Sequence, residues 1–399
     1  MENPKIRFKG FTKDWDQRKF GEVFQEYSEK NHPELPALTI IQGGGTVLRE
    51  ESDRNLQYNK SSLSGYKMVC ENDFIVHLRS FEGGLEKSNH KGLISPAYHT
   101  FHGDNVDSRF YYPYFRSYEF IKHKLVPHVY GIRDGRSIDI DGMKTIEIPY
   151  TSYEEQKKIG DYIQSLDHLI TLHQRKCEQT KNLKKYMLQK MFPQNGAKVP
   201  EIRFNGFTHD WEQRKLGDLV DRVTRKNQDL VSELPLTISA QYGLIDQNEF
   251  FDKRVASKDV SGYYLIENGE FAYNKSTSTD APWGAIKRLD RYENGVLSTL
   301  YIVFGIKENN PVDSDFLVSY YSTNLWHKGI HEIAAEGARN HGLLNIAPAD
   351  FFQTRLMIPQ DIEEQKKIGK YFIELEALIT LHQRHTDFYK KTSCYFISS

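Results

Sequence analysis

Two short segments carry residue types that could cleave a phosphodiester. Glu155-Gln156-Lys157 and Glu364-Gln365-Lys366 resemble the last residues of a nuclease motif. Both fall in the first turn of a predicted helix, where Glu is favoured by the helix dipole and by capping. We therefore favour a structural role for these residues over a catalytic one.

Other chemically capable groups also have simpler interpretations. Histidines at equivalent positions of a helical repeat are typical of polar core positions that fix helix register. Glycine runs without a following helix are typical of turns, and a run of aromatic residues is typical of a hydrophobic core. The groups are His173 and His382, Gly43-Gly44-Gly45, Gly83-Gly84, and Tyr111-Tyr112-Pro113-Tyr114-Phe115.

Sequence motifs of common catalytic sites are missing. The chain contains no phosphate loop, dinucleotide fingerprint, His-Glu-x-x-His, G-x-S-x-G or Asn-Pro-Pro-aromatic motif. Cys70, Cys177 and Cys394 are odd in number and lack metal-ligand spacing. We expect no catalytic residue, no metal site and no cofactor bound by this chain.

Two long helices are predicted after Ile-Pro pairs. Ser152-x-x-Glu155 and Asp361-x-x-Glu364 fit helix starts, and residues 151–191 would then extend about 60 Å. Apolar residues at alternating steps of four and three form a narrow seam that requires a partner. We expect the helices to pair antiparallel with each other; parallel pairing in a homodimer is the alternative. The seam residues are Ile159, Ile163, Leu166 and Ile170, then Ile368, Phe372, Leu375 and Ile379.

The chain is an internal repeat of about 200 residues. PKIRFKGFTKDWDQRKFG at 4–21 returns at 200–217 with five differences, and EEQKKIGDYIQSLDHLITLHQR at 154–175 returns at 363–384 with 16 identities in 22 positions. The segments between them diverge and hold short apolar runs typical of strands, such as 74–78, 301–306, 145–149 and 355–359, with a helical stretch at 315–326. A shared α+β scaffold with two different recognition surfaces follows from this pattern.

Composition bounds the class of protein. The 399 residues include 53 Lys+Arg and 54 Asp+Glu, and residues 1–150 hold 21 of each. Such balance argues against a generally basic nucleic-acid coat protein. The N-terminus lacks a signal-peptide core and no window suits a bilayer span, so we expect a cytoplasmic protein.

The doubled Ile-Arg-Phe-x-Gly-Phe-x-x-Asp-Trp leader and the doubled Ile-Pro and Glu-Glu-Gln-Lys-Lys-Ile segments closely resemble the specificity (S, HsdS) subunits of Type I restriction-modification systems. The resemblance implies target-recognition domains at 1–150 and 194–360, each reading half of an asymmetric bipartite DNA site. It implies helices at 151–193 and 361–399 that form a spacer with pseudo-two-fold symmetry and dock two modification (methyltransferase) subunits. Two restriction subunits would complete the complex.

Catalysis in that family lies in the partners, which implies that S-adenosylmethionine, ATP and Mg²⁺ are bound there. The C-terminal tail departs from the family pattern: it is shorter than its counterpart after Arg175 and has polar seam positions at Thr386 and Ser393. The contact that the family implies between the C-terminus and the N-terminal domain is therefore the part of the resemblance that this tail affects.

Base readout requires polar side chains on loops: Arg for guanine, Asn or Gln for adenine. Loops at matching places of the two repeats supply the candidates, each of which could also be an ordinary solvated loop residue. In the first domain they are Gln42, His77, Arg79, Arg133, Asp134 and Arg136; in the second, Gln241, Tyr242, Asn274, Lys275, Ser276, Arg339, Asn340 and His341.

Two other functions fit parts of the pattern. A self-contained nuclease or methyltransferase with degenerate motifs predicts activity from the purified chain alone. A coiled-coil regulator predicts helix pairing between chains and no specific DNA target.

Overall fold

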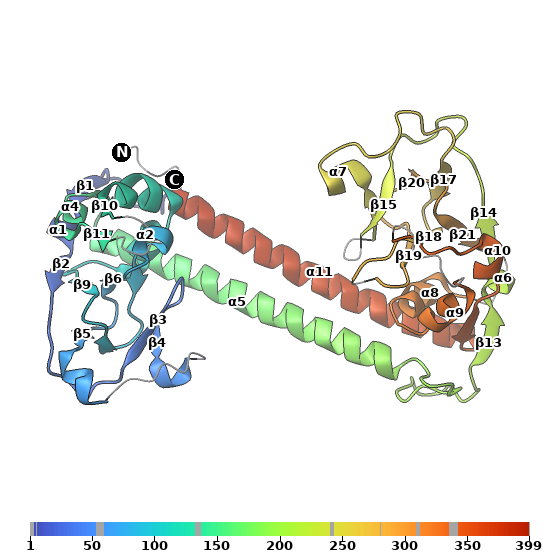
Figure 1. Ribbon diagram of the computed structural model, residues 1–399, viewed down its shortest axis with the longest axis horizontal. Coiled ribbons are helices and arrows are strands. Elements are labelled where there is room, and N and C mark those ends of the chain that lie inside the picture. Colours follow the sequence, from blue (N-terminus) through green and yellow to red (C-terminus); the bar gives the residue numbers. More distant parts are fainter. Residues whose placement is uncertain are drawn as a thin grey trace. The chain divides into compact units, whose positions relative to one another are not determined.

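A computed structural model describes residue 4 and residues 6–52, 60–131, 137–239, 243–279, 281–308, 312–334 and 342–398. The chain forms two compact units. Residues 1–175 and 383–399 make the first unit, and residues 176–382 make the second. Two long helices, α5 (Tyr153–Lys190) and α11 (Ile362–Ser398), each contribute residues to both units (Figure 1). The predicted long helices are confirmed to within three residues at each end.

The first unit contains one four-stranded antiparallel sheet, ordered β2-β9-β6-β7, with four two-stranded sheets: β1-β12, β3-β4, β5-β8 and β10-β11. Its elements before α5 are β1 (Asp16–Lys19), α1 (Phe20–Val23), β2 (Gln25–Tyr27), β3 (Leu38–Ile41), β4 (Gly45–Leu48), η1 (Arg49–Glu51), η2 (Lys60–Gly65), β5 (Lys67–Val69), β6 (Phe74–Val76), α2 (Ser80–Gly83), β7 (Glu86–Lys87), β8 (Gly92–Ile94), β9 (His99–His102), α3 (Ser108–Phe115), η3 (Glu119–Leu125), η4 (Val126–His128), β10 (Val129–Tyr130), β11 (Ser137–Ile138), α4 (Ile140–Lys144) and β12 (Glu147–Tyr150).

The second unit repeats this topology: the sheet β14-β21-β18-β19 corresponds to β2-β9-β6-β7, and β13-β22, β15-β16 and β17-β20 correspond to three of the pairs. Its elements are β13 (Glu212–Lys215), α6 (Leu216–Leu219), β14 (Val220–Val223), β15 (Leu236–Ser239), β16 (Gly243–Asp246), α7 (Gln247–Phe251), β17 (Tyr264–Glu267), β18 (Phe271–Asn274), β19 (Ala285–Arg288), β20 (Asn294–Leu297), β21 (Ile302–Ile306), α8 (Ser314–Tyr321), α9 (His327–Ile333), α10 (Pro348–Phe351) and β22 (Arg355–Ile358).

Aromatic side chains fill the core of each unit. Phe20, Phe74 and Phe115 are completely or almost completely buried in the first core, where the Phe74 and Phe115 ring centroids lie 4.9 Å apart. The run Tyr111–Phe115 forms most of α3 and packs into this core, which confirms its interpretation as core. Because the strands are short, these large rings supply much of the apolar area that each unit buries.

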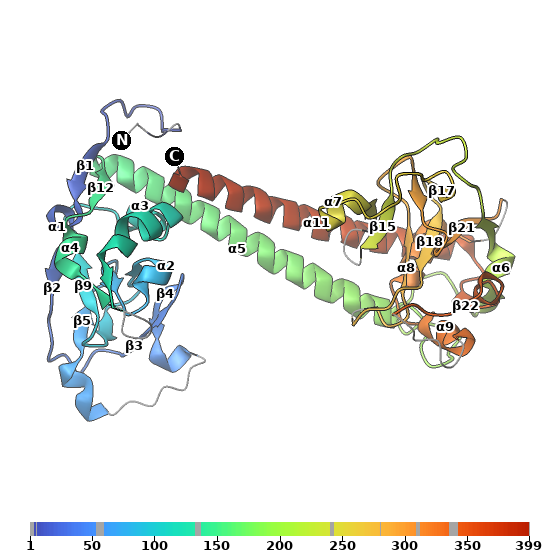
Figure 2. The same ribbon diagram turned by 45° about the horizontal axis from the view of Figure 1, so that its top comes forward.

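The first turns of both long helices belong to these cores. Ile159 and Ile163 pack with Phe20 in the first unit, and Figure 2 shows α3 beside this part of α5. In the second unit, Ile368, Phe372 and Leu375 pack with the sheet residues of that unit. The seam predicted for helix pairing therefore begins as a face that anchors each helix to its own domain.

The later parts of the helices pack against each other. In the second unit, the Cys177 thiol lies 3.9 Å from the carbonyl oxygen of Ile379, and Lys184 forms an ion pair with Glu376. From the first contact to the second, the residue number increases along α5 and decreases along α11. These segments therefore run antiparallel. In the first unit, the His173 ring lies 4.7 Å from the His385 ring, which agrees with the predicted polar seam position. Thr386 is buried there as well.

Candidate functional site

The first predicted reading loop is the turn between β3 and β4. Gln42 is exposed at this turn, and its side chain lies against α2: a Cβ placed on Gly83 would come within 2.0 Å of the Gln42 Nε2 atom. The absence of a side chain at Gly83 is therefore what lets Gln42 pack there. The contact brings Gln42 to the segment that begins with His77 and Arg79.

The glycines of this turn have a structural role. Gly43 and Gly45 adopt φ values of 82° and 73°, which favour glycine. Their N–H groups donate to Glu86, from Gly43 to Oε1 at 2.7 Å and from Gly45 to Oε2 at 3.1 Å. A carboxylate of the chain itself thus occupies the donors that could have held a phosphate, and the interpretation as a turn is confirmed.

His77 and Arg79 lie on the segment that joins β6 to α2. Arg79 is exposed, whereas His77 is half-buried and its backbone N–H donates to Ser80 Oγ at 2.9 Å. Burial lowers the pKa of His77, and the nearby Glu86 raises it less strongly. Within the described part of the chain, the buried Nε2 atom of His77 makes no hydrogen bond. The lowered pKa favours the neutral form of the imidazole.

Arg133, Asp134 and Arg136 lie outside the described residues. The strands on either side of them are described: β10 and β11 pair antiparallel, with Val129 opposite Ile138 and Tyr130 opposite Ser137.

In the second domain, Asn274 is the last residue of β18, and Lys275 and Ser276 follow it directly. The Asn274 amide nitrogen donates to the Tyr301 hydroxyl at 3.3 Å, and its oxygen accepts from the Ser276 N–H at 3.0 Å. Lys275 Nζ lies 3.5 Å from the carbonyl oxygen of Ile346. Asn274 is thus used to shape the loop, whereas Ser276 is exposed.

A second segment lies directly against this loop. The Thr277 N–H donates to the carbonyl oxygen of Gly342 at 2.7 Å, and the Leu344 N–H donates to that of Lys275 at 3.0 Å. Arg339, Asn340 and His341, which immediately precede Gly342, lie outside the described residues.

Tyr301 ties a third segment to the same place. Its hydroxyl lies 3.5 Å from Thr237 Oγ1 on β15, besides accepting from Asn274. Gln241 and Tyr242, predicted to lie just after β15, are outside the described residues. Tyr301 therefore links β15 to Asn274, and the loop after β18 is bonded to Gly342 and Leu344.

Sequence reasoning missed the residues that hold each helix to its domain. In the first unit the Glu155 carboxylate is 1% exposed and accepts from Arg7 Nε at 2.6 Å, Arg7 Nη2 at 2.8 Å and Trp15 Nε1 at 3.2 Å. Burial raises the pKa of Glu155, but hydrogen bonds from Arg7 and Thr151 outweigh it, so the net shift is downward. This carboxylate is committed to an ion pair and is not placed like a free metal ligand.

The second unit contains the same arrangement. Glu364 is 1% exposed and accepts from Arg203 Nε at 2.6 Å and from Trp211 Nε1 at 3.4 Å. The Arg and Trp residues belong to the repeated leader, and the Glu residues belong to the repeated helix start. Their joint repetition was the signal that could have revealed the contact.

The next residue of each helix makes a second contact. The Gln156 side-chain oxygen accepts from the backbone N–H of Asp107 at 3.0 Å, and the Gln365 oxygen accepts from that of Asp313 at 2.8 Å. Both glutamines are fully buried. We name each Arg-Trp-Glu-Gln arrangement a helix lock. Ser152 caps the start of α5 as predicted, with Oγ 3.4 Å from the Glu155 N–H.

Most of the seam residues predicted to form the helix interface and the docking surface are buried. Ile159, Ile163, Leu166, Ile368, Phe372, Leu375 and Ile379 are between 2% and 8% exposed, and Ile170 is half-buried. Other apolar residues of α11 face solvent: Ile373, Leu378 and Leu381 are 36%, 45% and 44% exposed. A partner that binds α11 would therefore touch this second face.

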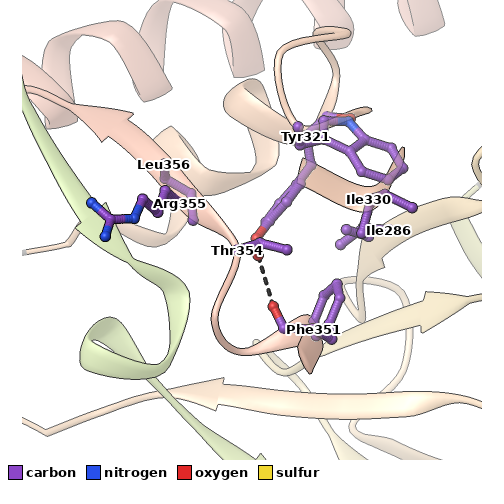
Figure 3. A pocket seen from close by; sticks show the side chains of 8 residues that line it. Ile286, Tyr321, Ile330, Phe351, Thr354, Arg355 and Leu356 are labelled. Carbon is purple, nitrogen blue, oxygen red and sulfur yellow. Dashed lines mark hydrogen bonds between the residues drawn. The ribbon is translucent and has the colours of Figure 1, made fainter. Parts of the chain in front are cut away.

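The described pocket of the second unit is too small to hold a cofactor. It is enclosed by Tyr321, Ile330 and Phe351 and has a volume of about 10 Å³, the room of about one water molecule. Its Thr354 hydroxyl is already bonded to the Phe351 carbonyl at 2.7 Å (Figure 3). Among the described residues, no group of three or more His, Cys, Asp or Glu side chains could hold a metal ion. None of the helices in these ranges is long and apolar enough to cross a membrane.

Comparison with solved structures defines the fold. The S subunit of a Type I restriction-modification system from M. genitalium superposes with a TM-score of 0.58 at 14% identity, over 99% of this chain and 98% of that one. The HsdS subunit from Thermoanaerobacter tengcongensis gives 0.45 at 14% identity, over 96% and 95%. A structure described as showing complex assembly and conformational transition of the type I R-M system gives 0.44 at 15% identity, over 99% and 98%.

The chain therefore has the fold of a Type I restriction-modification S subunit, along nearly its whole length. No protein-family model matches the sequence, and no curated protein matches it.

Proposed function

We propose that this chain is the DNA-specificity subunit of a Type I restriction-modification complex, with no catalytic activity of its own. Each domain, 1–150 and 194–360, reads one half of an asymmetric bipartite site. The observation that carries the proposal is that one topology occurs twice with different polar loops, in a chain with the S-subunit fold. Two different readers on one scaffold suit two different half-sites.

The long helices supply the spacer and the docking surface in this proposal. Their antiparallel pairing gives the two recognition domains opposed polarity through a pseudo-two-fold axis, and helix length sets the gap between half-sites, as dimer geometry does in other DNA-binding proteins. Two modification subunits bind the helices and methylate adenine with S-adenosylmethionine. Two restriction subunits add ATP- and Mg²⁺-dependent cleavage in the cytoplasm.

Near-neutral domains suit this arrangement. Residues 200–360 hold 17 basic and 22 acidic residues, so nonspecific attraction to phosphates is small. Affinity would then come from partner subunits that close around the DNA, while the loops of this chain supply selectivity.

Genome-wide adenine methylation mapping tests the proposal directly. The chain is co-expressed with modification subunits, and methylated adenines are located by sequencing. We expect an interrupted, two-part motif. Methylation at a continuous palindrome, or methylation that persists without this chain, would contradict the proposal.

A charged substitution on the exposed apolar face of α11 tests whether the modification subunit binds there. Leu381→Glu places a carboxylate on the exposed face of α11 and should weaken binding of the modification subunit by about tenfold or more, without lowering thermal stability. Lys370→Glu, a polar exchange at an exposed position of the same helix, is the matched control. Equal binding by both variants in a pull-down assay would place the interface elsewhere.

A further inference from the structure

The buried carboxylate of Glu86 holds the turn that carries Gln42 in the first domain. Besides the two glycine N–H groups of the β3–β4 turn, its carboxylate accepts from the Tyr112 hydroxyl at 2.7 Å and from the Arg116 guanidinium. The residue is fully buried. Four donors from two segments, the turn at 43–45 and the end of α3, therefore meet on one carboxylate. This satisfies the requirement that a buried charge be paired and hydrogen-bonded.

Arg116 closes a ring of contacts around this carboxylate. A Cβ placed on Gly43 would lie 3.0 Å from Arg116 Nη2, and one placed on Gly84 would lie 2.9 Å from Arg116 Cα. Gly83, the neighbour of Gly84, is the residue against which Gln42 packs. The turn at 42–45, strand β7, the end of α3 and helix α2 are thus connected in a closed loop.

Three of the predicted base-contacting residues belong to, or lie next to, the segments connected in this way. Gln42 is on the turn, and Arg79 and His77 immediately precede α2. His77 also lies close enough to Glu86 and Arg116 to feel both charges. Displacing the turn would therefore displace Gln42 and the surface that adjoins His77.

At the position that corresponds to Glu86, the second domain carries a residue of opposite charge, Lys287. Ile75 pairs with Glu86 between β6 and β7, and Ala272 pairs with Lys287 between β18 and β19, in the register where Phe74 and Phe271 correspond. A lysine ammonium has no acceptor for backbone N–H groups. The second domain cannot hold its turn with the residue at this position.

We propose that Glu86 is a positioning residue for base selectivity, which holds the turn of Gln42 and the segment of His77 and Arg79 as one rigid reading element of the first domain. This inference rests on the proposed function. Glu86 then affects base selectivity in the first half-site and not in the second. The physical reason is that a preorganised polar group discriminates between bases better than a mobile one.

The test compares two halves of one methylation motif. Glu86→Gln keeps the shape of the side chain but removes the charge that pairs with Arg116 and one of the two equivalent oxygens. Glu82→Gln, an exposed glutamate on α2, is the matched control. Both variants are co-expressed with modification subunits, and tolerated mismatches are counted separately for each half-site, beside thermal unfolding of the purified chain.

We expect Glu86→Gln to relax discrimination in the first half-site by about tenfold or more, with the second half-site unchanged and Glu82→Gln like the original chain. If that variant does not fold, Gly43→Ala disturbs the same turn without touching the carboxylate and should give the same one-sided relaxation. Unchanged selectivity, or equal relaxation of both halves, overturns the inference. If the original chain directs no bipartite methylation at all, the proposed function fails instead.

Discussion

At the scale of single residues, the two buried glutamates of the helix locks are each held by an ion pair and further hydrogen bonds. Each is nearly inaccessible to water and is held by an Arg that is 15% or 13% exposed. Removing one member of such a pair leaves the other charge poorly solvated, which costs more than the pair itself contributes.

Glu155→Gln should lower the free energy of unfolding by about 2 kcal/mol, because Arg7 loses its counter-charge while most of the hydrogen bonds can remain. Urea unfolding measures the effect. Glu154→Gln changes the exposed neighbour and should stay within about 0.5 kcal/mol. Similar losses from both variants would mean that Glu155 acts through the helix dipole rather than through Arg7.

His77 makes stability depend on pH. Its pKa is lowered from 6.5 in the folded chain, so the unfolded chain binds more protons as pH falls below that value. Stability contributed by neutral His77 is thus present above pH 6.5 and is lost as pH falls toward the folded pKa. His77→Asn should make the thermal unfolding midpoint depend less on pH between pH 5.5 and 7. The same substitution at the exposed His90 should leave that pH dependence unchanged. Parallel profiles for all three proteins would contradict this assignment.

At the scale of elements, each long helix approaches its domain through a glycine. A Cβ on Gly369 would come within 2.7 Å of backbone atoms of Asp315 and Phe316 at the start of α8. A Cβ on the equivalent Gly160 would meet Asp107 and Arg109 side-chain atoms at 3.1 Å. Backbone cannot rotate away as a side chain can, so the two sites differ in tolerance.

Gly369→Ala should therefore destabilise the protein by about 1–3 kcal/mol through overpacking, although alanine gains up to about 1 kcal/mol in helix propensity. Gly160→Ala should stay within about 1 kcal/mol of the original chain. Denaturant unfolding of the two variants side by side measures the contrast. Equal effects would show that α8 can shift away from α11.

Elements were predictable from sequence where their causes are local. The starts of α5 and α11 follow from Ser152 and Asp361 with an apolar repeat behind them, and strands such as β6 and β21 follow from short apolar runs. Glu86 was not predictable as the anchor of the Gly43–Gly45 turn, because its partners lie about 40 residues away. Periodicity predicted a continuous apolar face on each helix, but it does not say that Ile159 and Ile368 pack into the cores of their own units.

At the scale of the whole molecule, the repeat separates constant contacts from variable ones. The helix locks use leader residues and helix-start residues that are the same in both copies. Within the divergent middle segments they contact the backbone N–H of Asp107 or Asp313, which any residue but proline supplies. The candidate readers all lie between these contacts.

Replacing residues 22–148 with the corresponding segment of another chain of this fold should change one half of the methylation motif and leave the other half intact. The reason is that the exchanged segment holds the first domain's loops but neither Arg7 nor Glu155. Methylation mapping in co-expressing cells measures the outcome, with the parental chains as references. A change in both halves would mean that the domains do not read independently.

The placement of the helix locks also bears on inheritance. The two leaders match at 13 of 18 positions and the two helix starts at 16 of 22, so similar protein segments lie on both sides of each variable segment. Homologous recombination between the stretches that encode them would join a new middle to an unchanged pair of anchors. Under the proposed function, such an exchange would give one domain a new target and keep the residues that anchor the helices.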